Sequence, residues 1–178
     1  LDRIGHVHGP GSRPWLAQLQ LIDAFVRRIA GAIAKDAGSD ISLVITSDHG
    51  MVLCPPDRRI NIESHPVLAP DVRWVAGDPR ARHIYTRPGS GPDVMARWRE
   101  VLGPDFDVVT RVELAEEEYF PQLDPDFSER LGDFMVIARS DALLASTSDS
   151  RSSSFLGQHG SMSMGEMLIP FRVFHSGG

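Results

Sequence analysis

Apolar residues recur at three- and four-residue spacing between Pro14 and Gly38, and this spacing predicts a long amphipathic helix. Charged residues lie mostly off the apolar stripe, and Pro14 suits the first turn of a helix. The stripe consists of Leu16, Leu19, Ile22, Phe25, Val26, Ile29 and Ile33. Residues 1–12, in front of this helix, are rich in glycine and predict a loop.

A short apolar and β-branched run, Ile41–Thr46, follows the helix. Polar residues bound it on both sides, and Asp48, His49 and Gly50 come directly behind it. This pattern predicts a buried parallel strand. A helix, a buried strand and polar residues at the carboxyl end of the strand are typical of α/β proteins, in which ligands bind at such strand ends.

The middle of the chain alternates strand and helix signals. Two strands separated by a short polar stretch predict a small antiparallel unit, and the elements behind it continue an α/β pattern. We expect strands at Val72–Ala76, His83–Thr86, Phe106–Thr110 and Phe134–Ala138, and helices at Pro92–Leu102 and Val112–Tyr119.

Two late segments carry clear local signals. The run Ser146–Ser154 is polar and of low complexity, and it predicts a mobile loop. Leu168–Phe174 predicts a final strand that contains Pro170. Because proline cannot donate a hydrogen bond to a neighbouring strand, we expect this strand at an edge or with a bulge.

Composition limits the classes of function. The chain has 178 residues, 42% hydrophobic and 24% charged, which suits one globular domain. Its net charge of −6 argues against an extended nucleic-acid surface, whereas a small anionic substrate is compatible with a bound metal ion. A single cysteine, Cys54, excludes an internal disulfide and fits a reducing compartment, so we expect a cytoplasmic location. No apolar run approaches ~20 residues, so we expect no membrane span.

Five candidate metal ligands are scattered along the sequence. They are Asp2, His6, Asp48, His49 and His159. Each short stretch alone is also typical of an ordinary turn or of surface chemistry, and Ser47 and Thr46 are expected to hydrogen-bond locally. Carboxylate and imidazole groups suit catalytic zinc, and they also suit manganese or iron. Five donors are too many for one open zinc site and too few for two complete ones, so the set suggests two metals with some ligands missing.

Three stretches carry a resemblance to a known family. LDRIGHVHGP, ITSDHGM and GQHGS, the last followed by EMLIPF, resemble elements of the nucleotide pyrophosphatase/phosphodiesterase (type I phosphodiesterase) family of the alkaline phosphatase superfamily. The resemblance implies an α/β fold with a mostly parallel sheet flanked by helices, here incomplete. It implies that residues 1–178 are the carboxyl-terminal part of a single catalytic domain, with a small antiparallel insertion at about residues 55–130.

The resemblance also implies roles for the five candidates. Asp2, His6 and His159 would hold one zinc, and Asp48 and His49 the second. The threonine or serine nucleophile of the family lies upstream of the first element, so we expect no nucleophile in this chain. The isolated chain is therefore expected to be inactive and to associate with itself or with the missing amino-terminal half.

The function that the resemblance implies is metal-dependent hydrolysis of phosphodiester or pyrophosphate bonds in nucleotides or related compounds. Alternatives are another hydrolase of the superfamily, acting on a phosphomonoester, phosphonate or sulfate ester, and a non-catalytic metal-binding domain. The remaining candidates carry weaker signals. We expect no ligand role for His8, and we expect buried structural roles for Cys54 and for the cluster Met162, Met164 and Met167.

Overall fold

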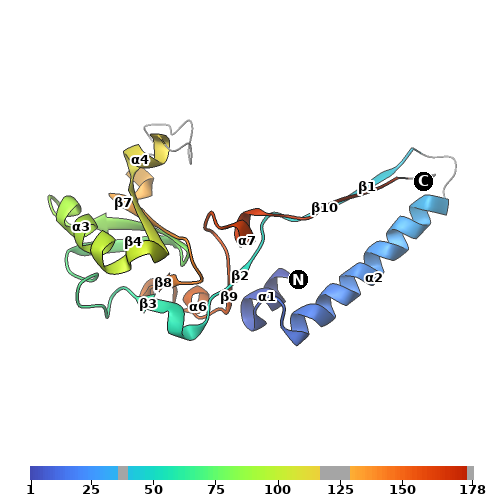
Figure 1. Ribbon diagram of the computed structural model, residues 1–178, viewed down its shortest axis with the longest axis horizontal. Coiled ribbons are helices and arrows are strands. Elements are labelled where there is room, and N and C mark those ends of the chain that lie inside the picture. Colours follow the sequence, from blue (N-terminus) through green and yellow to red (C-terminus); the bar gives the residue numbers. More distant parts are fainter. Residues whose placement is uncertain (36–39, 117–128, 176–178) are drawn as a thin grey trace.

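Residues 1–35, 40–116 and 129–175 are described by a computed structural model, and Figure 1 shows a body from which a long arm extends. The body contains a four-stranded antiparallel sheet in the order β4-β5-β7-β6. Its strands are β4 (Val72–Asp78), β5 (Ala81–Thr86), β6 (Phe106–Thr110) and β7 (Phe134–Ala138). The predicted antiparallel unit is confirmed, and the sheet continues through β7.

Helices cover both faces of this sheet. On one face, α3 (Gly91–Leu102) buries Val94, Trp98 and Leu102, and the Trp98 ring meets Phe134 edge-to-face at 5.7 Å between centroids. On the other face, α4 (Arg111–Glu116) buries Leu114 in a second apolar cluster. The predicted helix Pro92–Leu102 is thus confirmed, and the part of Val112–Tyr119 beyond residue 116 lies outside the described residues.

Three pairs of short strands complete the sheets. The pair of β3 (Arg59–Asn61) and β8 (Leu143–Ala145) is parallel. The pair of β2 (Val52–Leu53) and β9 (Gly157–Gln158) is antiparallel, as is the pair of β1 (Ser42–Thr46) and β10 (Phe171–His175). The α/β class is therefore confirmed, with parallel and antiparallel strands mixed. The expectation of a mostly parallel sheet is not confirmed, because among the described strands only the pair of β3 and β8 is parallel.

The arm consists of α2 (Arg13–Lys35), β1 and β10. The predicted amphipathic helix is confirmed, but none of its residues is buried. The prediction of a buried parallel strand at Ile41–Thr46 is wrong in both respects, since β1 pairs antiparallel with β10 and leaves Val44 49% exposed. A β-branched run specifies a strand that suits burial, but it specifies neither the direction of its neighbour nor which residues cover it.

Two further predictions are corrected, and the predicted final strand, Leu168–Phe174, is confirmed only from Phe171 onward. The expected loop at residues 1–12 contains the helix α1 (Asp2–His8). The expected mobile loop Ser146–Ser154 forms a 3₁₀ turn, Thr147–Asp149, and the short helix α6 (Ser150–Ser153), because Arg82 donates to Asp149 and Ser153. The final strand begins at Phe171, directly after Pro170, so the proline takes no place in the ladder.

The remaining elements are short. They are α7 (Met164–Met167) and the 3₁₀ turns Pro56–Arg58, Gly103–Asp105 and Glu129–Leu131. No helix among the described residues is long and apolar enough to cross a bilayer.

Candidate metal centre

The fold brings all five predicted donors together where the arm joins the body. Asp2 and His6 lie four residues apart on α1, so their side chains share one face of a helix. Asp48 and His49 lie in the turn that follows β1, and His159 comes directly after β9.

Backbone hydrogen bonds bring these three segments together. β2 pairs with β9 so that Val52 lies opposite Gln158, and the turn before β2 therefore meets His159. On the other side, the Leu156 amide donates to the His6 carbonyl at 2.8 Å, which ties α1 to the segment before β9. No part of this pairing is visible in the spacing of the donors along the sequence.

The polar atoms of the donors converge. Asp2 Oδ1 lies 3.3 Å from His6 Nε2 and 3.9 Å from His49 Nε2. Asp48 Oδ1 lies 3.8 Å from the same His49 nitrogen, and the Asp48 side chain is 89% exposed. The His159 ring stacks on His49 at 3.5 Å between centroids and lies 5.1 Å from the His6 ring. Asp2, His6 and His159 offer ligand atoms that all lie within 4.8 Å of one another.

Two of the imidazoles are fixed by backbone carbonyls. His6 Nδ1 lies 2.8 Å from Gly157 O, and His49 Nδ1 lies 2.6 Å from Gly50 O. Because a carbonyl oxygen only accepts hydrogen bonds, each Nδ1 must carry the proton. Each Nε2 is then left with its lone pair toward the cluster, which is the arrangement common for metal-binding histidines. The donor set therefore fits a divalent cation.

The surroundings of His159 favour its neutral form. Burial lowers the pKa of His159, and the nearby His49 and His6 lower it further, while Asp2 and Asp78 act in the opposite direction. A neutral imidazole is the form that binds metal ions.

Glycines allow the segments to approach one another closely. A Cβ atom on Gly157 would lie less than 3.0 Å from Gly5 O, and a Cβ atom on Gly50 would lie less than 3.0 Å from Gly165 O. Backbone atoms cannot move aside as the end of a flexible side chain can. Gly157 and Gly50 are therefore required for the packing of α1 and of the 48–50 turn.

A hollow of about 530 Å³ opens beside the cluster, and Asp2, Asp48 and His49 are among its lining residues. Two hydroxyl groups lie at its edge and bond locally, as predicted. Ser47 Oγ donates to His49 O at 3.0 Å, and Thr46 Oγ1 donates to Ser47 O at 3.5 Å.

Cys54 is buried, whereas the three candidate methionines are exposed. Cys54 is fully buried, as predicted, and burial raises the pKa of its thiol to about 11. The prediction of a buried methionine cluster is wrong, because Met162, Met164 and Met167 are 47%, 71% and 57% exposed. Methionine suits both cores and binding surfaces, so residue type alone does not separate the two.

The sequence predicts no role for Arg80 and Glu166. In the structure the two form a pair, and Glu166 hydrogen-bonds to the segments that carry His49 and His159. Glu166 belongs to the EMLIPF stretch that carries part of the family resemblance. No local pattern marks Arg80, because a buried arginine and an exposed one look alike in a sequence.

Comparison with known proteins places the chain in a family. The family model for type I phosphodiesterase / nucleotide pyrophosphatase matches residues 1–162. Murine ectonucleotide pyrophosphatase/phosphodiesterase 5 has a similar fold, with a TM-score of 0.76 and 20% identity over 97% of this chain and 44% of that chain. Phosphonoacetate hydrolase from Sinorhizobium meliloti 1021, in complex with phosphonoformate, has a TM-score of 0.66 and 21% identity over 98% of this chain and 44% of that chain.

A curated relative is GPI ethanolamine phosphate transferase 1 from Aspergillus oryzae, 31% identical over 123 residues, which is 66% of this chain and 11% of the fungal protein. The chain thus spans less than half the length of each of these three proteins. The match over residues 1–162 and the alkaline-phosphatase-like α/β fold agree with the resemblance found in the sequence, and the chain belongs to the type I phosphodiesterase / nucleotide pyrophosphatase family.

Proposed function

We propose that the protein is a metal-dependent hydrolase of phosphodiester or pyrophosphate bonds in nucleotides or related compounds, and that this chain supplies five of its metal ligands. One observation carries the proposal. Side chains at residues 2, 6, 48, 49 and 159 meet in one cluster, with their polar atoms a few ångströms apart. Scattered surface residues have no physical reason to gather in this way.

The cluster divides into two sets of donors. Asp2, His6 and His159 would hold one cation, and Asp48 and His49 would hold the second. We propose zinc, for which oxygen and nitrogen donors are usual, with manganese or iron as alternatives. Divalent cations bound here would supply positive charge against the charge that develops on the phosphoryl oxygens.

The residues of this chain orient and expose the site. The carbonyls of Gly157 and Gly50 hold the His6 and His49 rings, and the exposed Asp48 carboxylate faces the open side, where a small phosphate ester can approach. We propose, as the family resemblance implies, that the threonine or serine nucleophile lies outside these 178 residues. The hydroxyls of Ser47 and Thr46 beside the cluster are bound to backbone oxygens, as expected for local structural roles. A cytoplasmic location, suggested by the single cysteine, is part of the same proposal.

Elemental analysis and turnover measurements on the protein from the complete reading frame test this function. We expect bound divalent metal, hydrolysis of an activated phosphodiester, and loss of both in His6→Ala. Bound metal without turnover of any phosphodiester, pyrophosphate, phosphomonoester, phosphonate or sulfate ester would favour a non-catalytic metal-binding domain. Turnover of one of the last three substrates alone would favour another hydrolase of the superfamily.

A second candidate is transfer of a phosphate ester to an acceptor alcohol. The observation behind it is the relative from Aspergillus oryzae, whose name describes an ethanolamine phosphate transferase. Product analysis with and without added alcohol separates the two reactions. Hydrolysis gives the same product under both conditions, whereas transfer gives a new ester only when the alcohol is present.

A further inference from the structure

A buried ion pair joins two parts of the chain that are 86 residues apart. Arg80, at the turn between β4 and β5, is 0% exposed, and Glu166, in α7, is 2% exposed. Arg80 Nε donates to Glu166 Oε1 at 2.9 Å, and Arg80 Nη2 donates to Glu166 Oε2 at 2.6 Å. The pair is bidentate, which fixes the relative orientation of the two side chains as well as their distance.

The remaining polar atoms of the pair are also engaged. Arg80 Nη1 donates to the carbonyls of Ser140 and Ala142 at 2.5 and 2.6 Å. The Glu166 carboxylate also accepts from the Ser161 amide at 3.1 Å and from the Ser163 hydroxyl. Each partner thus reaches beyond the pair to a separate stretch of backbone.

Glu166 touches both segments that carry the candidate ligands. Its carboxylate accepts the amide of Ser161, two residues after His159, and its carbonyl accepts the Gly50 amide, next to His49, at 2.7 Å. The stacked rings of His49 and His159 are therefore attached, through one or two residues each, to the same glutamate.

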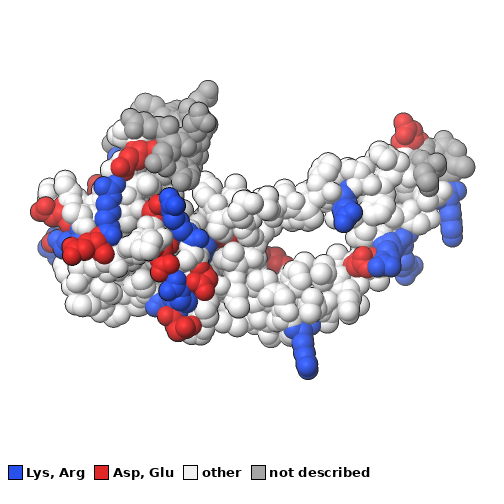
Figure 2. Space-filling view, in the orientation of Figure 1, with Lys and Arg blue, Asp and Glu red and all other residues white. Residues whose placement is uncertain are grey.

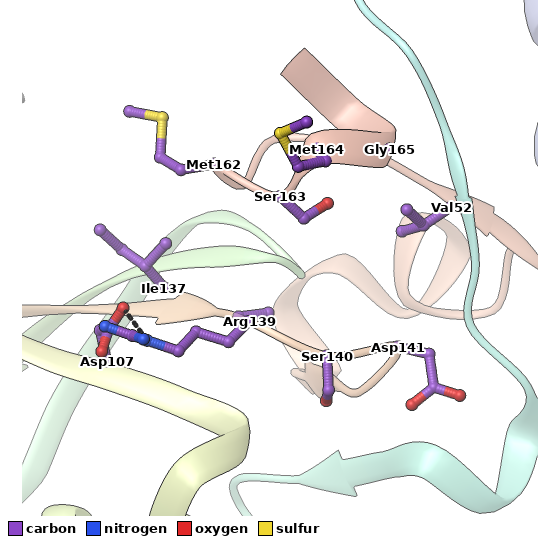
Figure 3. Close-up of a pocket in the computed structure, with 11 residues that line it drawn as sticks. Val52, Asp107, Ile137, Arg139, Ser140, Asp141, Met162, Ser163, Met164 and Gly165 are labelled. Atoms are coloured by element: carbon purple, nitrogen blue, oxygen red, sulfur yellow. Dashed lines mark hydrogen bonds and ion pairs between the residues drawn. The ribbon is translucent and has the colours of Figure 1, made fainter. Parts of the chain in front are cut away.

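The same pair joins the two walls of a hollow of about 630 Å³ (Figure 3). One wall is residues 162–165, which contain the Ser163 hydroxyl bound to Glu166. The other wall includes Ser140, whose carbonyl is bound to Arg80. Figure 3 shows Ser163 above and Ser140 below, with the hollow between them.

Stability alone does not account for this arrangement. Removing two charges from water costs so much that a buried ion pair is often no more stabilising than apolar residues of the same size. What the pair supplies is fixed geometry. We propose that Arg80 and Glu166 are positioning residues, which hold the 48–50 turn and the 159–161 segment at the separation that the metal centre requires. The inference rests on the proposed metal-dependent function, and it adds a role for two residues outside the ligand set.

Three variants test the proposal in the protein from the complete reading frame. Glu166→Gln removes the charge, Arg80→Lys keeps a charge but loses the bidentate geometry, and the double change of Arg80→Met with Glu166→Met replaces the pair by apolar side chains. The matched control is Asp133→Asn, whose carboxylate binds the amide and hydroxyl of Thr86 at the far end of β5. The readouts are the dissociation constant for Zn²⁺ by chelator competition, amide hydrogen exchange of the metal-free protein, and the thermal midpoint.

We expect each of the three variants to bind Zn²⁺ at least about tenfold more weakly. We also expect faster exchange at the Gly50 and Ser161 amides in the metal-free protein, including in the double variant where the thermal midpoint is retained. Asp133→Asn should lower the thermal midpoint without changing the affinity for Zn²⁺ or the exchange of the Gly50 and Ser161 amides. Folded variants with the zinc affinity and the two exchange rates of the unaltered protein would overturn the proposal.

The affinity for Zn²⁺ and the amide exchange rates together separate this inference from the proposed function. If the unaltered protein binds no metal, the proposed function fails and the exchange rates alone decide the role of the pair. Selective loss of protection at Gly50 and Ser161 then supports positioning. Exchange that rises equally throughout the body shows that the pair serves only general stability.

Discussion

At the scale of single residues, the three donors that cluster most tightly give the most direct prediction. Because Asp2, His6 and His159 offer atoms within 4.8 Å of one another, His159→Ala should lower the affinity for Zn²⁺ at least about tenfold. His8→Ala is the matched control, since His8 lies on the same helix as His6 and belongs to none of the cluster's contacts. Isothermal titration of metal-free protein measures both, and equal affinities of the two variants would contradict the assignment.

Cys54 carries a prediction about reactivity. Burial raises the pKa of its thiol to about 11, so at pH 8 only about one molecule in a thousand carries the thiolate that reacts with disulfide reagents. We expect the native protein to react far more slowly with a colorimetric disulfide reagent than the same protein in denaturant. Equal rates in both conditions would show that the thiol is accessible.

Glu166 links charge to stability. Burial alone would raise the pKa of Glu166, but the hydrogen bonds and charge of Arg80, with the bonds from Ser163 and Ser161, outweigh burial and hold the pKa below its usual range. A glutamate in the unfolded chain has a pKa of about 4.3. The stability that the ionised Glu166 contributes is therefore complete above that pH, and it is lost as the pH falls through the lower pKa of the folded state. Chemical denaturation between pH 6 and pH 3 should therefore show a smaller acid-induced loss of stability in Glu166→Gln. A loss as steep as that of the unaltered protein would contradict this account.

At the scale of elements, the periodicity of apolar residues predicts strands well where their apolar side chains are buried in the same chain. The predictions at Phe106–Thr110 and Phe134–Ala138 match β6 and β7 residue for residue, because both strands bury their apolar side chains in the sheet of the body. The sequence does not predict the opening helix, because Gly5, Gly9 and Pro10 are local signals for a loop. Contacts with a segment 151 residues away, such as His6 with Gly157, support α1, and no local pattern contains them.

The approach of α1 to β9 predicts opposite effects for two glycine substitutions. Gly157→Ala should destabilise the protein by about 1–3 kcal/mol and weaken metal binding, because the added methyl group meets the Gly5 backbone. Gly31→Ala is the matched control in α2, where a Cβ meets nothing within 4 Å and alanine favours the helix by about 0.8–1.0 kcal/mol. Chemical denaturation measures both, and a neutral Gly157→Ala would show that the two segments separate at little cost.

At the scale of the whole molecule, the arm exposes much apolar surface. Figure 2 shows acidic and basic side chains crowded over the body, whereas the arm is mainly white with scattered charged side chains. Large apolar side chains are exposed in the arm and in the segment leading into it. These are Leu16, Leu19, Leu21, Phe25, Val44, Met167, Leu168, Ile169, Phe171, Val173 and Phe174. Soluble monomers rarely expose so many large apolar residues together, and such surfaces are typical of interaction sites.

The lengths of the relatives point to the segment that covers the arm. This chain matches 44% of each of the two solved neighbours, so more than half of each neighbour has no counterpart here. We propose that residues of the protein outside these 178 pack on α2 and on the β1–β10 pair in the native state. Such packing would also bury β1. Its sequence is typical of a buried strand, yet the described residues leave it partly exposed.

It follows that the 178 residues alone should associate with themselves and turn over no phosphodiester. Phe25→Glu and Phe171→Glu place charges on the arm surface, where Phe25 is 64% and Phe171 71% exposed, and they should shift the protein toward monomer. Trp74→Glu is the matched control, because Trp74 is 64% exposed on β4 of the body, away from the arm. Sedimentation velocity over a range of concentrations measures the effect. A monodisperse, fully active monomer of the unaltered chain would show that the arm surface needs no cover, and association lost equally in Trp74→Glu would place the contact on the body instead.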